Sequence, residues 1–204
     1  MKKDSFLLLV TLVLFLSGTA RALEEKDVPP ELDFFRRGAR VGHFEIPIEA
    51  GEYFADKFDH SFLLGTGLYY TPLPPLSIGV DFGYGWMSFD PTSRFGQAMT
   101  DDKMMLLHGV VRLALPGAYR SKKAIKEVDF YTTLGGGLTR LGDANRGTGF
   151  IGGGMKMYTK WDWLATRVEV RNYFMTVPTT TGDKFAADLV VTAGPVFQLP
   201  PFMD

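Results

Sequence analysis

The chain has 204 residues, of which 46% are hydrophobic and 22% charged, and its 22 basic and 23 acidic residues give a formal net charge of −1. This composition excludes a disordered tail and a helical membrane bundle, and the balanced charge creates no field that favours nucleic acid. Cysteine is absent, which excludes disulfides, thiolate catalysis and cysteine-based zinc sites. The 23 glycines and the 14% aromatic content favour β-strands in which both residue types alternate.

The N-terminal segment has the three regions of a secretory signal peptide. Lys2 and Lys3 precede an apolar run over residues 6–16, and small residues follow at Ala20 and Ala22. A membrane anchor is the alternative, but the run would span only about 16 Å as a helix, against a hydrocarbon core of about 30 Å. We therefore expect residues 1–22 to be removed on export. No later stretch approaches the length of a transmembrane helix.

Residues 23–39 form a charged leader that contains two adjacent prolines. Its charge and proline content predict a disordered periplasmic segment. The alternative is a docking peptide for an envelope partner. The pair Phe34 and Phe35 favours docking, because two adjacent exposed phenylalanines are costly in water.

Residues 76–87 alternate strictly between two kinds of side chain. The even positions are apolar or aromatic, from Leu76 to Trp86, and the odd positions between them are Ser, Gly and Asp. A period of two predicts a β-strand with one apolar face. The opposite face is dominated by glycine, which suits a crowded barrel interior better than a solvated surface.

The same alternation recurs in seven further segments, which are 43–50, 62–70, 105–115, 128–138, 150–159, 164–174 and 188–198. Strands of about ten residues match the roughly 9–11 needed to cross a bilayer at a tilt of about 45°. An even number of strands is expected of a closed bacterial barrel. The sequence therefore predicts an all-β fold, an eight-stranded antiparallel up-and-down transmembrane β-barrel over residues 40–199, followed by a tail at 200–204.

The connections fit an up-and-down meander. Short turns are expected at 71–75 and 160–162, and longer polar loops at 55–60, 88–102, 141–148 and 175–183. With a periplasmic N-terminus, the longer loops would face the cell exterior. Segment 116–127 departs from this rule, because it reads as a long basic turn on the periplasmic side.

Aromatic residues gather where strands should meet the two membrane interfaces, as expected of tyrosine and tryptophan. The expected outer girdle is Phe54, Trp86, Tyr173 and Phe174, and the expected inner girdle is Tyr70, Tyr158, Trp161, Trp163 and Phe197.

These features together resemble the small outer-membrane β-barrels of Gram-negative bacteria, of the OmpA/OmpX/OmpW-like kind. More narrowly, the chain is similar to the deltaproteobacterial "outer membrane β-barrel domain" proteins. Residues 192–199 are similar to the terminal signal that the barrel-assembly machinery reads, although Pro195 interrupts it and residues 200–204 follow it. The resemblance implies location in the outer membrane and brings no catalytic residues.

The interior is where chemistry would reside. A barrel of eight strands has a lumen just wide enough for side chains to fill. Alternation predicts that ten charged side chains point inward, and these are Glu45, Glu49, Asp81, Arg112, Asp129, Lys156, Arg167, Glu169, Arg171 and Asp188. We interpret them as a salt-bridge network that fills the lumen, since unpaired charge is costly there. A charged permeation path or gate is the alternative.

Other candidate sites are weaker. His43 and His108 also face inward, but they lie on different strands with no third metal ligand at a recognisable spacing. Residues 59–61 read Asp-His-Ser, but neighbours on a strand face opposite sides, which disfavours a catalytic triad. The glycine runs 135–137 and 152–154 lack the Lys-Ser/Thr of a phosphate loop and are attributed to tight packing in the barrel. No catalytic, cofactor-binding or metal site is predicted.

Two function classes remain open. The first is a non-enzymatic structural or scaffold component of the cell envelope. The second is a binding or transport barrel for a small or lipidic ligand, which the resemblance to OmpW-like barrels implies. A soluble lipocalin-like barrel would need an apolar interior, and the charged inner face argues against it. The expected partners are outer-membrane lipid, lipopolysaccharide and the barrel-assembly machinery. An envelope protein partner is left open, and no nucleic acid is expected.

Overall fold

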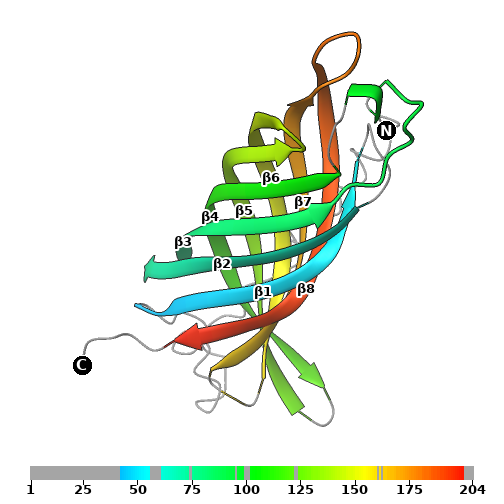
Figure 1. The fold of residues 1–204 in the computed structure, drawn as a ribbon. Helices are drawn as coiled ribbons and strands as arrows, with labels where there is room; N and C mark the ends of the chain where they lie inside the picture. The colour runs from blue at the N-terminus through cyan, green and yellow to red at the C-terminus, as the bar shows by residue number, and fades with distance from the viewer. Residues whose placement is uncertain are drawn as a thin grey trace.

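A computed structural model describes residues 42–55, 61–73, 75–94, 96–98, 102–121, 124–159, 161 and 163–199. In these ranges eight antiparallel strands follow one another around a closed barrel, because β1 pairs with both β2 and β8 (Figure 1). The strands are β1 (Phe44–Phe54), β2 (Ser61–Leu73), β3 (Leu76–Trp86), β4 (Lys103–Ser121), β5 (Ala124–Leu141), β6 (Ala144–Tyr158), β7 (Leu164–Val177) and β8 (Lys184–Leu199). The predicted eight-stranded antiparallel barrel is confirmed.

The two faces of the strands are as the alternation predicts. In β3, the outward side chains Ile78, Val80, Phe82 and Trp86 are 43 to 54% exposed, whereas Asp81 between them is buried. The barrel therefore presents large apolar side chains to its surroundings and encloses polar ones, the reverse of a soluble barrel. Within the described ranges, no helix is long and apolar enough to cross a membrane.

The hairpin of β4 and β5 is longer than expected and replaces the predicted basic turn. Pairing between the two strands continues to Ser121 and Ala124, whereas the contact of β4 with β3 ends at Leu113 and that of β5 with β6 starts at Val128. The prediction of a long turn over 116–127 was therefore wrong. The two segments satisfy each other's backbone groups beyond the barrel wall, and Figure 1 shows this hairpin projecting from one end of the barrel.

One loop was also predicted too long. Leu141 pairs with Ala144, so the connection expected over 141–148 is a turn at Gly142 and Asp143. Gly142 has a φ of 55°, a left-handed conformation that glycine adopts without steric cost. The polar residues that suggested a loop belong to β6 instead. The predicted signal peptide (1–22), leader (23–39) and tail (200–204) lie outside the described residues.

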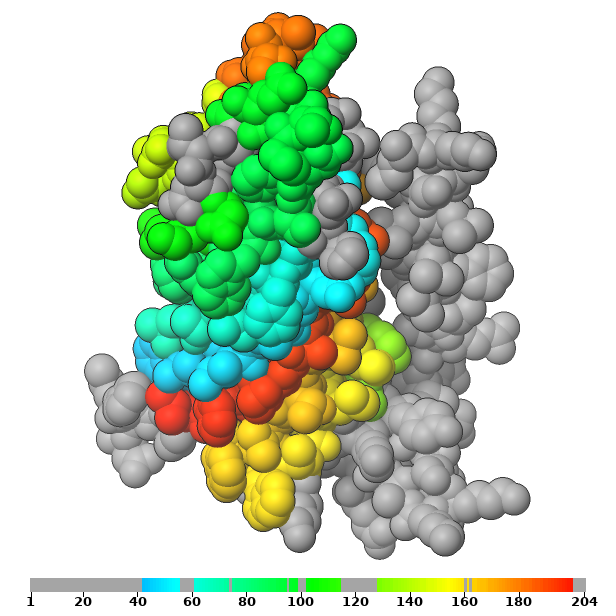
Figure 2. All heavy atoms as spheres, turned by 45° about the vertical axis from the view of Figure 1, so that its right-hand side comes forward, coloured from blue at the N-terminus to red at the C-terminus, as the bar shows by residue number. Residues whose placement is uncertain are grey.

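Two loops meet at the mouth of the barrel opposite the projecting hairpin. The loop after β3 contains the short 3-10 helix η2 (Gly96–Ala98), and its Arg94 carbonyl accepts a hydrogen bond of 3.1 Å from Thr180 N in the loop after β7. Figure 2 shows these green and orange segments against each other at the top of the molecule. Arg146 forms two hydrogen bonds with Asp183, of 2.5 and 2.9 Å, which tie β6 to the second loop.

Aromatic rings stack on the outer face near both ends. Trp163 lies between Trp161 and Phe197, with centroid distances of 6.0 and 6.1 Å, and Phe174 stacks on Phe185 at 6.4 Å. Two predicted girdle members are placed differently. Tyr173 is buried in the lumen against Phe150, and Tyr158 directs its hydroxyl to the inward Asp129. Each tyrosine lies an even number of residues from the inward charged side chains of its own strand. The alternation of the strand therefore directs it into the lumen, despite the tendency of tyrosine to lie at an interface.

Candidate functional site: the barrel lumen

All ten charged side chains predicted to face inward are buried, and every strand except β2 contributes at least one. Most of them surround the part of the lumen nearest the start of β1, which we call the charged half. Their contacts connect strands that are not neighbours in the barrel wall.

The carboxylate of Glu169 is the centre of this network. Arg171 Nε donates to Glu169 Oε1 at 2.6 Å, while Arg167 Nε and Arg112 Nη2 lie 3.4 and 3.6 Å from Oε2. The hydroxyl of Tyr131 donates to Oε2 at 2.9 Å. Arg167 and Arg171 lie two positions before and after Glu169 on the same face of β7, and the fold adds Arg112 from β4 and Tyr131 from β5.

A second group ties β1 to β4, β5 and β6. Lys156 Nζ donates to Glu45 Oε1 at 2.6 Å and lies 3.9 Å from Asp129 Oδ2. Arg112 Nη1 lies 3.6 Å from Glu45 Oε2, and the Tyr158 hydroxyl donates to Asp129 Oδ2 at 2.6 Å. Each carboxylate therefore has a cation and a further donor close by.

The remaining predicted residues extend the network along the lumen. Arg167 Nε donates to Glu49 Oε1, so Arg167 joins Glu49 to Glu169. Arg171 Nη2 lies 2.7 Å from Asp81 Oδ2 on β3. Asp188 lies farther toward the loop end, where the Tyr53 hydroxyl donates to it at 2.9 Å.

Tyrosines also belong to the network, although the charge pattern of the sequence did not predict them. Tyr53, Tyr69, Tyr131 and Tyr158 each donate a hydrogen bond to one of the predicted carboxylates. The guanidinium of Arg112 lies between two of these rings, 4.1 Å from the centroid of Tyr69 and 4.5 Å from that of Tyr131. Such stacking stabilises a cation that is removed from water. The alternation of the strands could have identified them, because each tyrosine is an even number of residues away from inward charges or glycines on its own strand.

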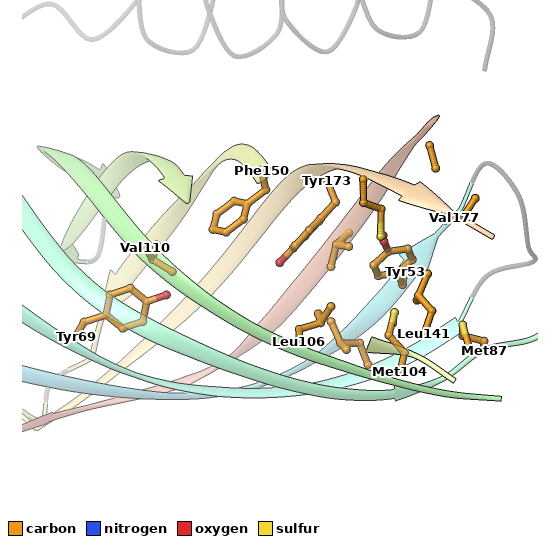
Figure 3. Close-up of a cluster of buried hydrophobic side chains, with 14 residues drawn as sticks. Tyr53, Tyr69, Met87, Met104, Leu106, Val110, Leu141, Phe150, Tyr173 and Val177 are labelled. Carbon is orange, nitrogen blue, oxygen red and sulfur yellow. The ribbon is translucent and has the colours of Figure 1, made fainter. Parts of the chain in front are cut away.

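The other part of the lumen is mainly apolar around Asp188, which the prediction of a charged inner face did not include. We call it the apolar half (Figure 3). Its cluster comprises Tyr53, Leu63, Tyr69, Met87, Met104, Leu106, Val110, Leu141, Phe150, Tyr173, Met175, Val177, Ala186 and Val190. Strand β4 explains why it was missed: Met104 and Leu106 point inward while Met105 and Leu107 point outward, so both faces of this strand are apolar.

The two histidines predicted to face inward lie at different places in the barrel. His108 lies in the lumen with Nε2 3.3 Å from Thr139 Oγ1, whereas His43 precedes β1 at one end of the barrel. No group of three metal-ligating side chains occurs in the described part of the chain. Ser61 Oγ accepts a hydrogen bond of 3.2 Å from Ser88 N, while residues 59 and 60 lie outside the described ranges.

No family model matches the chain, and no curated protein matches it in sequence. Among solved structures, the chain is similar to Neisserial surface protein A (NspA), at 12% identity and a TM-score of 0.48, over 76% of this chain and 95% of that one. It is also similar to the N-terminal β-barrel domain of Pseudomonas aeruginosa OprF, at 12% identity and a TM-score of 0.40, over 78% and 98%. A de novo designed transmembrane β-barrel is 16% identical with a TM-score of 0.39, over 78% and 97%. These likenesses transfer no function.

Proposed function

We propose that the chain is an integral outer-membrane protein of a Gram-negative bacterium with a non-enzymatic, structural or scaffold role, and that its lumen is closed by its own side chains. The observation that carries the proposal is the inverted distribution of polarity. Large apolar side chains cover the outer face of a closed barrel, while charged side chains pair inside it. A lipid bilayer is the surroundings in which this arrangement is stable.

The packing of the lumen supports a structural role over transport. The charged half is crossed by ion pairs between opposite walls, and Met104, Leu141 and Val177 in the apolar half are fully buried. To pass through, an ion would have to break these ion pairs in the charged half and lose its hydration water in the apolar half. Both steps make steady conduction unfavourable. Transport or ligand binding is therefore the second candidate.

Export and assembly complete the proposal. Residues 1–22 would direct secretion, and lipopolysaccharide and phospholipid would surround the mature barrel. Residues 192–199, which we expect the barrel-assembly machinery to recognise, belong to β8. This strand pairs with β1 and closes the barrel. This position supports the assignment, because a closing strand has to be recognised before the barrel is sealed.

Refolding into lipid vesicles tests the membrane assignment. The protein should float with the vesicles, and unboiled samples should migrate differently from boiled ones in SDS, because a closed hydrogen-bond ladder resists the detergent. Failure to float, together with identical migration, would contradict a membrane barrel.

Planar bilayer recordings test the closed lumen separately. We expect no steady conductance from the inserted protein. Stable, ion-selective openings would contradict the structural role and favour transport.

A further inference from the structure

A cavity of about 30 Å³ lies at the barrel wall where the charged half of the lumen meets the apolar half. It exists because two glycines, Gly65 of β2 and Gly83 of β3, pair opposite each other and leave the wall without side chains. Its polar lining includes Glu49, Asp81, His108, Arg171 and Thr192, and its apolar lining includes Leu63, Leu106 and Val190.

His108 is the residue that points to an occupant. Its side chain is 1% exposed, and its Nδ1 has no hydrogen-bond partner among the described residues. The other ring nitrogen, Nε2, lies 3.3 Å from Thr139 Oγ1, and this hydroxyl accepts a hydrogen bond from Thr148. Whichever ring nitrogen carries the proton, Nδ1 is left as a buried donor or acceptor that requires a partner.

The fixed position of the ring limits what that partner can be. Phe150 and Tyr173 contact the imidazole at centroid distances of 5.5 and 5.3 Å, so the ring cannot turn freely to find a protein group. Because His108 lines the cavity, the cavity can supply the partner. Water can donate to Nδ1 in one tautomer and accept from it in the other.

The volume and the remaining lining fit water as well. One water needs about 10–15 Å³ of cavity and two to four polar partners, so the cavity has room for about two. Asp81 and Arg171 line it, and the Asp81 carboxylate has acceptor capacity beyond its 2.7 Å contact with Arg171 Nη2. We propose that this cavity binds about two resident water molecules, one of which is hydrogen-bonded to His108 Nδ1.

The proposal assigns a boundary to the hydration of the lumen. The apolar wall of the cavity, formed by Leu63, Leu106 and Val190, belongs to the packed apolar cluster that continues toward the loops. The proposed water would therefore lie at the level of His108, against this apolar cluster. This site is independent of whether the protein is a scaffold or a transporter, since it concerns the wall between the two halves.

Substitution of Gly65 distinguishes a wet cavity from an empty one by the sign of its effect. A Cβ built at Gly65 meets only Phe82 O, at 3.6 Å, so the backbone accommodates Gly65→Ala and the methyl group enters the cavity. In a wet cavity the methyl displaces water and removes the partner of His108, so the midpoint of denaturant unfolding falls. In an empty cavity the methyl fills space, and the midpoint rises.

Two further variants separate hydration from general effects of alanine. Gly109→Ala places its methyl group on the outer face, where the nearest atom is Gly136 O at 3.8 Å. Its change in midpoint measures the intrinsic gain of replacing glycine by alanine in a strand, and the midpoint of Gly65→Ala should fall below that reference in a wet cavity. His108→Leu removes the nitrogen that needs a partner, so the loss caused by Gly65→Ala should be smaller in that background. An equal loss in both backgrounds would contradict the assignment to His108.

Nuclear magnetic resonance detects the water directly. In refolded protein with labelled histidine, we expect cross-relaxation between the His108 ring and long-lived water, and its disappearance in Gly65→Ala. A wild-type ring without a water contact, together with a raised midpoint in Gly65→Ala, would overturn the proposal while leaving the closed barrel intact.

Discussion

Lys156 of β6 and Glu45 of β1 form an ion pair across the lumen, with 2.6 Å between Nζ and Oε1. The two strands are not neighbours in the barrel wall, so this contact joins walls that the backbone ladder does not connect directly. The network therefore braces the barrel from inside in addition to filling it.

Replacing Lys156 by methionine tests this brace. In Lys156→Met, Glu45 loses its nearest described cation, and the more distant Arg112 stays at 3.6 Å. Removing one partner of a buried ion pair commonly costs about 3–5 kcal/mol, because the other charge stays buried. We expect a loss near the lower end in the free energy of unfolding, measured by urea titration in lipid vesicles. As a control, Arg140→Met at the exposed rim pair with Asp143 should cost under about 1 kcal/mol.

Glu169→Gln should be the most damaging neutralisation in the charged half. Three guanidiniums and the Tyr131 hydroxyl converge on this carboxylate, and an amide can accept but cannot balance their charge. We expect a loss of at least about 3 kcal/mol in unfolding free energy. Asp188→Asn is the comparison, because its carboxylate lies outside this three-arginine centre. A smaller loss for Glu169→Gln than for Asp188→Asn would show that the centre of the network lies elsewhere.

The strands and their faces could be predicted because alternation records them directly. A strand that is apolar on one face and polar on the other, such as β3, shows its orientation residue by residue. Strand β4 does not, since Met104 and Met105 are both apolar but face opposite sides. The apolar half of the lumen was missed for this reason, as periodicity vanishes where both faces have the same polarity.

The glycines show a second limit. Gly135 and Gly137 face the crowded interior, as predicted, and a Cβ at Gly135 would meet the Phe150 ring. Gly136, however, faces outward and pairs with both Gly109 and Gly149, which forms a row without side chains on the outer face. A run of consecutive glycines does not show which of them face the lumen and which face outward, because the alternation of side chains is lost when all residues are the same. Contacts across the lumen, such as that between Arg112 of β4 and Glu169 of β7, depend on closure of the barrel and are likewise absent from local sequence.

The loop after β3 should respond to acid through Asp90. Its carboxylate accepts hydrogen bonds from the backbone N–H of Thr92 at 2.8 Å and from the Thr92 hydroxyl at 2.7 Å. The backbone contact and then the hydroxyl contact lower the pKa of Asp90 below its ordinary value of 3.8. The turn is therefore favoured above the unfolded pKa and is weakened as pH falls through the folded one. We expect the Thr92 amide resonance to titrate with a midpoint below 3.8 and to lose this titration in Asp90→Asn.

Adjacent residues of β3 provide a test of the two faces of the wall. Val80 is outward and 54% exposed, so Val80→Arg places a cation against the hydrocarbon core, at a cost of about 2–4 kcal/mol near the midplane. Gly79 faces inward, where a Cβ would lie 2.6 Å from the Tyr69 ring and press on Leu68 O, so Gly79→Ala should cost about 1–3 kcal/mol by overpacking. The two losses in stability should respond differently to the solvent around the barrel. In lipid vesicles both variants should be destabilised relative to wild type, whereas in a short-chain detergent that water penetrates more readily the Val80→Arg penalty should shrink and the Gly79→Ala penalty should persist. If Val80→Arg folds into lipid as well as wild type, the outer face of β3 does not contact the bilayer.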